Sequence, residues 1–259
     1  MYAIFDTTVY YTVCVTMLVL AAIVFVVLRR VGVGYGALYN PCWGPAVNNR
    51  LGWVLMEAPV FLAMLILWLL SSRRGEASLI VMASLFEMHY FQRAFIFPFL
   101  IRGKNKMPWV IIITGILFNL VNSYMIGGWL FYVSPVDRYP ASWLYSPLFI
   151  TGTLIFITGF IINLHSDYII RHLRKPGDTR HYIPKGGMFR YVTSANYFGE
   201  LTEWIGYAVL TWSLGGLVFV IWTFANLAPR AKVLHERYIR EFGENYTSLC
   251  RRYMLPFIY

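Results

Sequence analysis

The sequence carries very little charge for its length. Only 13% of its 259 residues are Asp, Glu, Lys or Arg, and 58% are hydrophobic. Soluble domains carry about 25% charged residues. Several uninterrupted apolar runs reach the roughly 20 residues that a helix needs to cross a bilayer. This excludes a soluble globular domain and predicts an all-α, polytopic integral membrane protein.

Cysteine pairs and the common soluble-enzyme motifs are also missing. The three cysteines, Cys14, Cys42 and Cys250, form no CxxC pair, so we expect neither a disulfide framework nor a bound metal. The sequence contains no P-loop, HExxH or G-x-S-x-G motif. The alternating glycines at 32–36 follow an apolar run rather than a strand, which makes a Rossmann fingerprint a weak interpretation. A nucleotide would therefore need an all-helical site.

Apolar runs predict membrane spans at 9–28, 53–71, 78–101, 109–133 and 147–166. The last run, 197–228, has 32 residues, and as one helix it would be about 48 Å long. A bilayer core is only about 30 Å thick. Because Ser213-Leu214-Gly215-Gly216 in its middle is typical of a turn, this run is either one tilted helix or two spans.

The net charge of +10 is explained by basic loops on the cytoplasmic side, without any nucleic-acid partner. Seven spans with the N-terminus outside and the C-terminus in the cytoplasm place 18 of the 22 Lys and Arg residues inside. Six spans would divide them 12 to 9, so seven are favoured. Arg73 and Arg74 are the exceptions. Residues 1–259 are expected to form one membrane-embedded domain, in which 229–259 is an amphipathic, basic, cytoplasmic interfacial tail.

Ionisable groups inside spans are costly and indicate functional sites. Glu57 is one candidate, because a carboxyl group in an apolar site can stay protonated and donate a hydrogen bond. Tyr90 is another. The alternative for Glu57 is a carboxylate at the start of a helix. The alternative for Tyr90 is an ion-pair network that only holds helices together. That network is the favoured interpretation of the neighbouring residues Glu87, His89 and Arg93. Asn119 and Asn122 lie one turn apart, and both inter-helix hydrogen bonding and function remain open.

Polar residues also recur on one face of the helices that approach the cytoplasmic side. A charged helix end explains Arg171 and Lys175 but not the deeper Asn163 and Asp167. With seven spans, these rows meet at one face and could form a pocket for a diphosphate-bearing cofactor, in which arginine suits phosphate. The three rows are Asn163, Asp167, Arg171 and Arg174; Asn196, Glu200 and Glu203; and Arg230, His235 and Tyr238.

These residues lie within stretches that resemble the steroid 5α-reductase family over nearly the whole chain. The stretches are "MEAP" at 56–59, "MHYFQRAFIFPFLIRG" at 88–103, "NLHSDYIIRHLRKPGD" at 163–178, "IPKGGMFRYV" at 183–192, "ANYFGELTEWIGYAVLTWS" at 195–213, "ANLAPRA" at 225–231 and "LPFIY" at 255–259.

The resemblance implies NADPH-dependent saturation of the C4–C5 double bond of a 3-oxo-Δ4 steroid that enters from the lipid. It implies that Glu57 and Tyr90 hydrogen-bond the 3-keto oxygen. It also implies that the cofactor site faces the cytoplasm, in either a bacterial inner membrane or the endoplasmic reticulum. The implied cofactor contacts are Asn122, Asn163, Asp167, Arg174, Asn196, Glu200, Arg230, His235 and Tyr238. The family commonly has Tyr-Lys or Tyr-Arg before "IP", whereas this chain has His181-Tyr182 after Arg180, so which of these three contacts the cofactor stays open.

Three alternatives remain. An enoyl-thioester or polyprenal reductase on the same scaffold would use similar hydride chemistry. An isoprenylcysteine-type membrane methyltransferase would have no need of the Glu57–Tyr90 pair. A non-enzymatic sterol binder would leave the basic cytoplasmic pocket unexplained.

Overall fold

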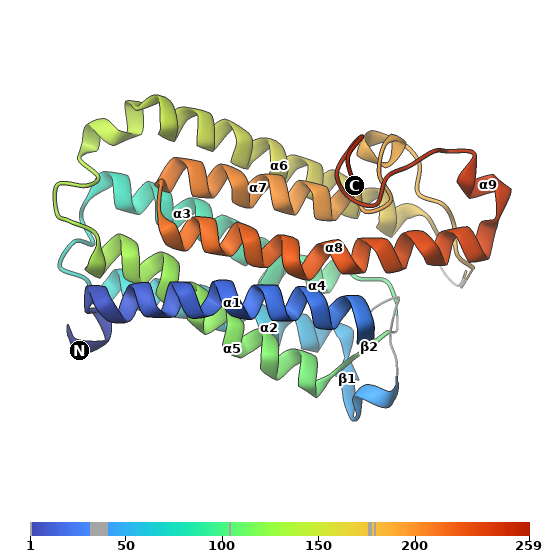
Figure 1. The fold of residues 1–259 in the computed structure, drawn as a ribbon, viewed down its shortest axis with the longest axis horizontal. Helices are drawn as coiled ribbons and strands as arrows, with labels where there is room; N and C mark the ends of the chain where they lie inside the picture. The colour runs from blue at the N-terminus through green and yellow to red at the C-terminus, as the bar shows by residue number, and fades with distance from the viewer. Residues whose placement is uncertain (1, 32–40, 104, 176–177, 179) are drawn as a thin grey trace.

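A computed structural model describes the whole chain except residues 1, 32–40, 104, 176–177 and 179, so the glycines at 32–36 lie outside the described residues. The helices run side by side along one long axis (Figure 1). The long elements are α1 (Thr7–Val31), α2 (Asn49–Leu70), α3 (Ala77–Phe91), α5 (Trp109–Ser123), α6 (Pro147–His172), α7 (Ala195–Thr211) and α8 (Leu214–Phe242). The short ones are η1 (Tyr2–Phe5), η3 (Pro41–Trp43), η4 (Gln92–Ile96), α4 (Phe97–Leu100), η5 (Tyr124–Val133), η6 (Ala141–Tyr145), η7 (Gly187–Arg190) and α9 (Glu244–Thr247).

Five helices of the described chain are long and apolar enough to cross a membrane: Thr7–Arg30, Asn49–Leu70, Trp109–Val133, Pro147–His172 and Leu214–Phe242. These agree with an integral membrane protein. Two further stretches, α7 with 17 residues and the run from α3 to α4, fall outside this set. The count of seven spans therefore stays a prediction.

The last apolar run forms two helices rather than one. Helix α7 ends at Thr211, and Trp212 adopts the left-handed conformation with φ 44°. The Ser213 hydroxyl then caps α8 by accepting the Gly216 N–H at 3.1 Å. Of the two alternatives, two helices are therefore confirmed, but the break lies at Trp212 and Ser213, and Gly215 and Gly216 belong to the first turn of α8. Helix α8 then continues without interruption through Pro229 into the predicted tail.

A π-helical turn, η4, joins α3 to α4. Pro98 cannot donate a backbone hydrogen bond and would crowd the preceding turn of an α-helix. The wider turn absorbs this, and the Phe97 N–H reaches the Gln92 carbonyl five residues earlier. The chain therefore forms a π turn before Pro98, a feature that is often found at functional sites.

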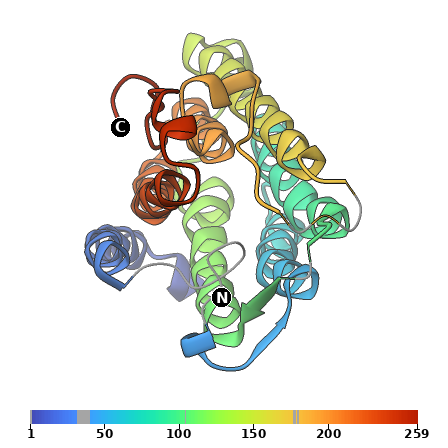
Figure 2. The same ribbon diagram turned by 90° about the vertical axis from the view of Figure 1, so that its right-hand side faces the viewer.

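The structure is not purely helical. Strands β1 (Ala46–Asn48) and β2 (Lys106–Pro108) pair antiparallel, with Val47 opposite Met107. Figure 2 views the bundle along its axis from the end where this pairing lies. Apolar periodicity could not reveal strands of three residues. They close the end of the bundle beside α2 and α5.

Candidate active site

Helices α2 and α5 position Glu57. The Asn119 amide on α5 donates to the Met56 carbonyl at 2.7 Å and to Glu57 Oε2 at 3.3 Å. One turn later, Ser123 Oγ donates to the Val60 carbonyl at 3.1 Å. Glu57 is only 9% exposed. The carboxyl group is thus held inside the bundle by an amide from the facing helix.

Tyr90 on α3 is held by the next polar residue of α5. The Asn122 amide donates to the Tyr90 hydroxyl at 3.0 Å, and both side chains are buried. Because Asn119 and Asn122 are three residues apart, they lie on the same helix face. This face gathers Glu57 and Tyr90, which come from different helices. Inter-helix hydrogen bonding, one of the two interpretations left open for the asparagines, is confirmed.

Aromatic rings surround Tyr90. Its ring centroid lies 4.6 Å from that of Phe86 and 5.8 Å from that of Trp204 on α7. Phe156 of α6 and Tyr207 of α7 extend this fully buried cluster. The hydroxyl of Tyr90 is therefore the polar tip of an otherwise apolar wall.

A buried hydrogen bond and a buried ion pair link α3 and η4 to α7 and α6. His89 Nδ1 lies 2.9 Å from Glu203 Oε1 on α7. Arg93 in the π turn lies 3.3 Å from Asp167 on α6, and its guanidinium stacks over the rings of Trp53 and Phe97. The network predicted for His89 and Arg93 is confirmed, although each residue pairs with a different helix.

Glu87 does not join this network. Both of its carboxylate oxygens are buried and have no hydrogen-bond partner among the described residues. The expectation that it belongs with His89 and Arg93 was wrong. Glu87 lies on the opposite side of α3 from His89, since two residues span about 200° of helix.

The row of polar residues on α6 meets the row on α7. The Asn163 amide donates to the Asn196 carbonyl at 3.0 Å, and both Asn163 and Asp167 are buried. Asn196 and Glu200 on α7 are half-buried. Arg174 lies just beyond the end of α6 and is exposed. The prediction that Asn163 and Asp167 are too deep for a solvated helix end is confirmed.

Residues of α8 contact the C-terminal segment. His235 Nδ1 lies 2.6 Å from Thr193 Oγ1 and 3.2 Å from the Tyr246 hydroxyl, and the ring of Tyr238 stacks on that of Tyr246. Neither Thr193 nor Tyr246 was foreseen, because nothing in the local sequence pattern links them to α8. Arg230 is half-buried on the same helix.

The three residues whose role stayed open contact other protein groups. Tyr182 donates to Asp178 at 2.6 Å, and Arg180 binds the same carboxylate. These hydrogen bonds hold the pKa of Asp178 well below its usual value, and the one from Arg180 has a larger effect than the one from Tyr182. His181 lies 2.6 Å from Glu241 of α8. The loop after α6 is thus tied to itself and to α8.

Unsatisfied buried atoms show where a polar ligand fits. Within the described chain, Asn122 Oδ1, Glu203 Oε2, Ser194 Oγ and Asn226 Oδ1 are buried and have no hydrogen-bond partner. Buried polar atoms are normally paired, so each calls for a partner. They lie on or beside α5, α7 and α8, and one of them, Asn122, is a predicted cofactor contact. Apart from the Ser194 hydroxyl these atoms are acceptors, so they suit the hydroxyl and amide hydrogens of a polar ligand.

The sequence also matches known proteins. Residues 105–259 match the family model described as 3-oxo-5-alpha-steroid 4-dehydrogenase. The rat 3-oxo-5-alpha-steroid 4-dehydrogenase 1 is 40% identical over 92% of this chain and 91% of its own length. The chain belongs to the 3-oxo-5-alpha-steroid 4-dehydrogenase family. The human protein of the same name is 40% identical over 91% of this chain and 90% of its own. The steroid 5-alpha-reductase DET2 of Arabidopsis thaliana is 35% identical over 90% of both chains.

Membership confirms the resemblance found in the sequence. It makes the chain an oxidoreductase, which excludes the methyltransferase and the non-enzymatic sterol binder. Within the described residues, no group of three or more His, Cys, Asp or Glu side chains is gathered to hold a metal ion.

Proposed function

We propose that this enzyme reduces the C4–C5 double bond of 3-oxo-Δ4 steroids, with NADPH as the reductant. The observation that carries the proposal is the convergence of Glu57 and Tyr90 on one face of α5, each held by an asparagine. Two hydrogen-bond donors on one helix face suit a ligand oxygen on which negative charge develops. The apolar wall around Tyr90 suits the hydrocarbon rings of a steroid.

The two asparagines determine which atoms are left for the substrate. Asn119 donates to Oε2 of Glu57, so the proton of the neutral carboxyl group belongs on Oε1, where it can be donated. Asn122 donates to the Tyr90 oxygen, so the hydroxyl hydrogen of Tyr90 is also free to point away from α5. Both residues then act as donors to the 3-keto oxygen. Reduction at C5 makes that oxygen an enolate, and these two hydrogen bonds stabilise it before C4 takes a proton.

NADPH would supply the hydride, held by residues of α5 to α8. Arg174 and Arg230 suit its phosphates, because the planar guanidinium group donates two parallel hydrogen bonds. Asn122, with a buried unpaired oxygen beside Tyr90, suits an amide N–H. The remaining contacts we assign are Asn163, Asp167, Asn196, Glu200, His235 and Tyr238. The ion pair of Arg93 with Asp167 holds this side of the site next to the carbonyl side.

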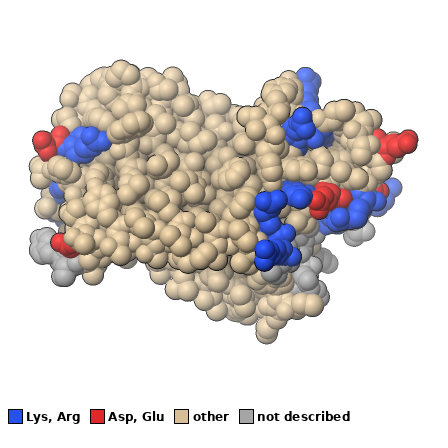
Figure 3. All heavy atoms as spheres, in the orientation of Figure 1, with Lys and Arg blue, Asp and Glu red and all other residues tan. Residues whose placement is uncertain are grey.

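We also propose that the site opens to the cytoplasm, with the N-terminus outside. Lys and Arg side chains gather at the end where α8 ends (Figure 3), as the positive-inside rule requires. Of the two exceptions at the other end, Arg73 is buried, pairs with Glu76 at 2.8 Å and donates to Ser134, whereas Arg74 is exposed. Tags at both termini should be accessible from opposite sides of the membrane, and accessibility from one side would exclude this topology.

Replacing either carbonyl donor tests the proposed chemistry. We expect Glu57→Gln and Tyr90→Phe each to lower kcat for a 3-oxo-Δ4 steroid about 100-fold or more, as loss of one such donor does elsewhere. The Kd for NADPH should stay unchanged in both variants. Turnover of purified protein with a panel of steroids, enoyl thioesters and polyprenals measures both the effect and the substrate class. Full activity in either variant would remove the carbonyl assignment, and preference for a thioester or polyprenal would replace the substrate.

The phosphate role of Arg174 has its own test. Arg174→Ala should raise the Kd for NADPH about 10-fold, as expected for a charge-assisted hydrogen bond of roughly 1.5 kcal/mol. The next residue, Lys175, is also exposed, so Lys175→Ala is a matched control for loss of one positive charge. Equal effects of the two changes would mean that Arg174 contributes only to the positive electrostatic potential of this surface and does not hydrogen-bond a phosphate.

A further inference from the structure

A surface cavity of about 400 Å³ lies between the loop that precedes α7 and the segment that follows α9. Its lining is Arg190, Tyr191, Leu249, Cys250, Arg252 and Phe257. Backbone hydrogen bonds fix its walls to each other: Arg252 N–H donates to the Tyr191 carbonyl at 2.9 Å, and Thr193 N–H donates to the Arg252 carbonyl at 2.8 Å. The cavity is therefore a built feature of the fold.

The lining combines positive charge with apolar surface. Arg190 and Arg252 are exposed, and no acidic residue is among the six lining residues. Tyr191 and Phe257 face each other across 5.6 Å between ring centroids. Arginine binds phosphate with two hydrogen bonds, and aromatic side chains are enriched where a membrane meets water. Two arginines beside two aromatic rings therefore match a ligand in which a phosphate group is joined to hydrocarbon chains.

The backbone presents two apolar side chains outward at the rim. Phe257 has φ 67°, a conformation uncommon for a residue of this size, and it is 77% exposed. Its neighbour Ile258 is 81% exposed. The turn is held because the N–H groups of Met254 and Leu255 both donate to the Tyr259 oxygen, at 2.8 and 2.6 Å. A constrained turn that exposes Phe and Ile indicates contact with something apolar.

The position of this turn indicates the bilayer. Its inner side chains, among them Leu255 and Tyr259, pack in one cluster with Phe25, near the end of α1, and with Phe224 of α8. Both helices are among those long and apolar enough to cross the membrane. The turn lies beside the end of α1 and the middle of α8, at the outer edge of the bundle, where a neighbouring lipid would lie (Figures 1 and 2). Lys and Arg gather at the same end (Figure 3).

We propose that the cavity bounded by Arg190, Arg252 and Phe257 binds the phosphate head group of an anionic phospholipid, with Phe257 and Ile258 inserted among the acyl chains. The C-terminal segment, whose walls also hold Thr193 against His235, is thereby anchored to the membrane surface. This site is independent of the assignment of Glu57 and Tyr90.

Spin labelling of the full-length protein in lipid nanodiscs tests the insertion. A nitroxide at Ile258→Cys, in a Cys42→Ser, Cys250→Ser background that leaves buried Cys14, should be more accessible to oxygen than to a water-soluble nickel complex. A label at Asn245→Cys on exposed α9 should show the reverse. Equal access of the nickel complex to both labels would overturn the proposal and leave the face to a protein partner.

Lipid charge tests the head-group site. Native mass spectrometry should show retention of phosphatidylglycerol over phosphatidylcholine, and each of Arg190→Gln and Arg252→Gln should lower that preference about fivefold. Arg240→Gln, an exposed arginine of α8 outside the cavity, is the matched control and should leave it unchanged. Loss of preference only in the control, or no preference in the parent protein, would overturn the proposal.

Discussion

The helix pairs α6–α7 and α2–α5 both use glycines to pack closely, but they place different atoms opposite those glycines. On α6 and α7, Gly152, Gly159, Gly199 and Gly206 recur at intervals of seven residues, and a Cβ at any of them would meet backbone atoms of the facing helix. On α5, a Cβ at Gly115 would meet the side chain of Met56, and on η5, which continues α5, a Cβ at Gly127 would meet the side chains of Met64 and Leu67. One interface is backbone against backbone, and the other is filled by flexible side chains.

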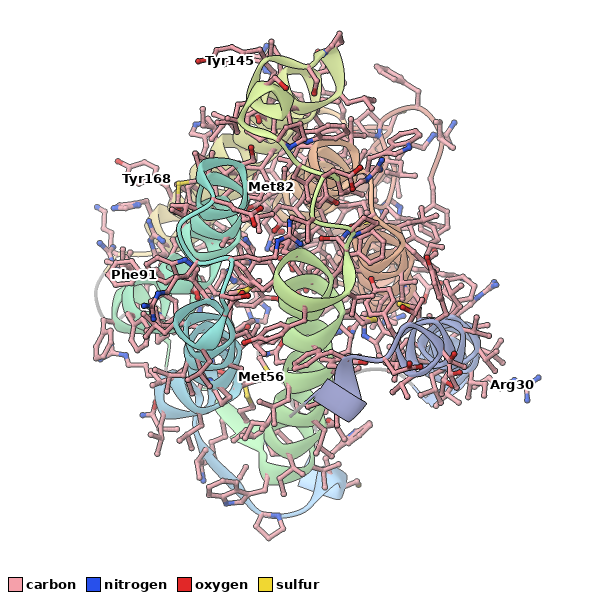
Figure 4. The ribbon with its side chains drawn as sticks, turned by 90° about the vertical axis from the view of Figure 1, so that its left-hand side faces the viewer. Arg30, Met56, Met82, Phe91, Tyr145 and Tyr168 are labelled. Atoms are coloured by element: carbon pink, nitrogen blue, oxygen red, sulfur yellow. The ribbon has the colours of Figure 1, made fainter. Side chains whose placement is uncertain are left out.

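This difference matches the roles proposed for the two halves of the site. Helices α6 and α7 carry Asn163, Asn196 and Glu200, so these proposed cofactor contacts rest on an interface in which backbone packs against backbone. Helices α2 and α5 carry Glu57 and its asparagine, and Figure 4 shows Met56 lying between these helices. Methionine adapts its shape at little cost. We infer a fixed cofactor side and an adjustable steroid side.

The largest effect is expected where no side chain can give way. At Gly206→Ala the new methyl group would lie 2.6 Å from the Gly152 carbonyl oxygen and would also meet the backbone of Phe156. The helices must separate, which should cost about 1–3 kcal/mol or more. We expect a lower Tm in detergent and weaker NADPH binding. Gly75→Ala, with no atom within 4 Å of the added methyl group, is the matched control. An unchanged Tm for Gly206→Ala would contradict a rigid α6–α7 interface.

Sequence patterns predicted the helices well and the contacts between them poorly. The positions of the long helices and a break close to Ser213 follow from apolar runs and local turn residues, which are properties of a single segment. The spacing of Asn119 and Asn122 also predicted a shared face. In contrast, the pairs His89–Glu203 and Thr193–His235 join residues more than 40 positions apart, and no local pattern contains that information. The convergence of Glu57 and Tyr90 was expected only from family resemblance.

A smaller effect is expected for the equivalent change on the adjustable side. At Gly115→Ala the added methyl group displaces only Cγ and Sδ of Met56, both in a flexible side chain. Alanine gains about 1 kcal/mol of helix propensity over glycine, so the Tm should hardly change. The KM for steroid should change, because Met56 adjoins Glu57, whereas the Kd for NADPH should not. A fall in Tm as large as that of Gly206→Ala would remove the distinction between the two interfaces.

The smallest effect is expected when the adjustable residue itself is made less flexible. Met56→Leu nearly conserves volume, and such changes usually cost under about 1.5 kcal/mol. The Met56 carbonyl would still accept the Asn119 amide, so Glu57 stays in place and kcat for the preferred steroid should be retained. Leucine has fewer rotatable bonds, and the ratio of kcat/KM values between bulky and slim 3-oxo steroids should shift by a few-fold. Met64 packs against Gly127 as Met56 packs against Gly115, and it lies about two helical turns from Glu57. Met64→Leu is therefore the matched control and should leave that ratio unchanged. If Met56→Leu leaves the ratio of kcat/KM values between bulky and slim steroids as unchanged as Met64→Leu does, the steroid side is as fixed as the cofactor side.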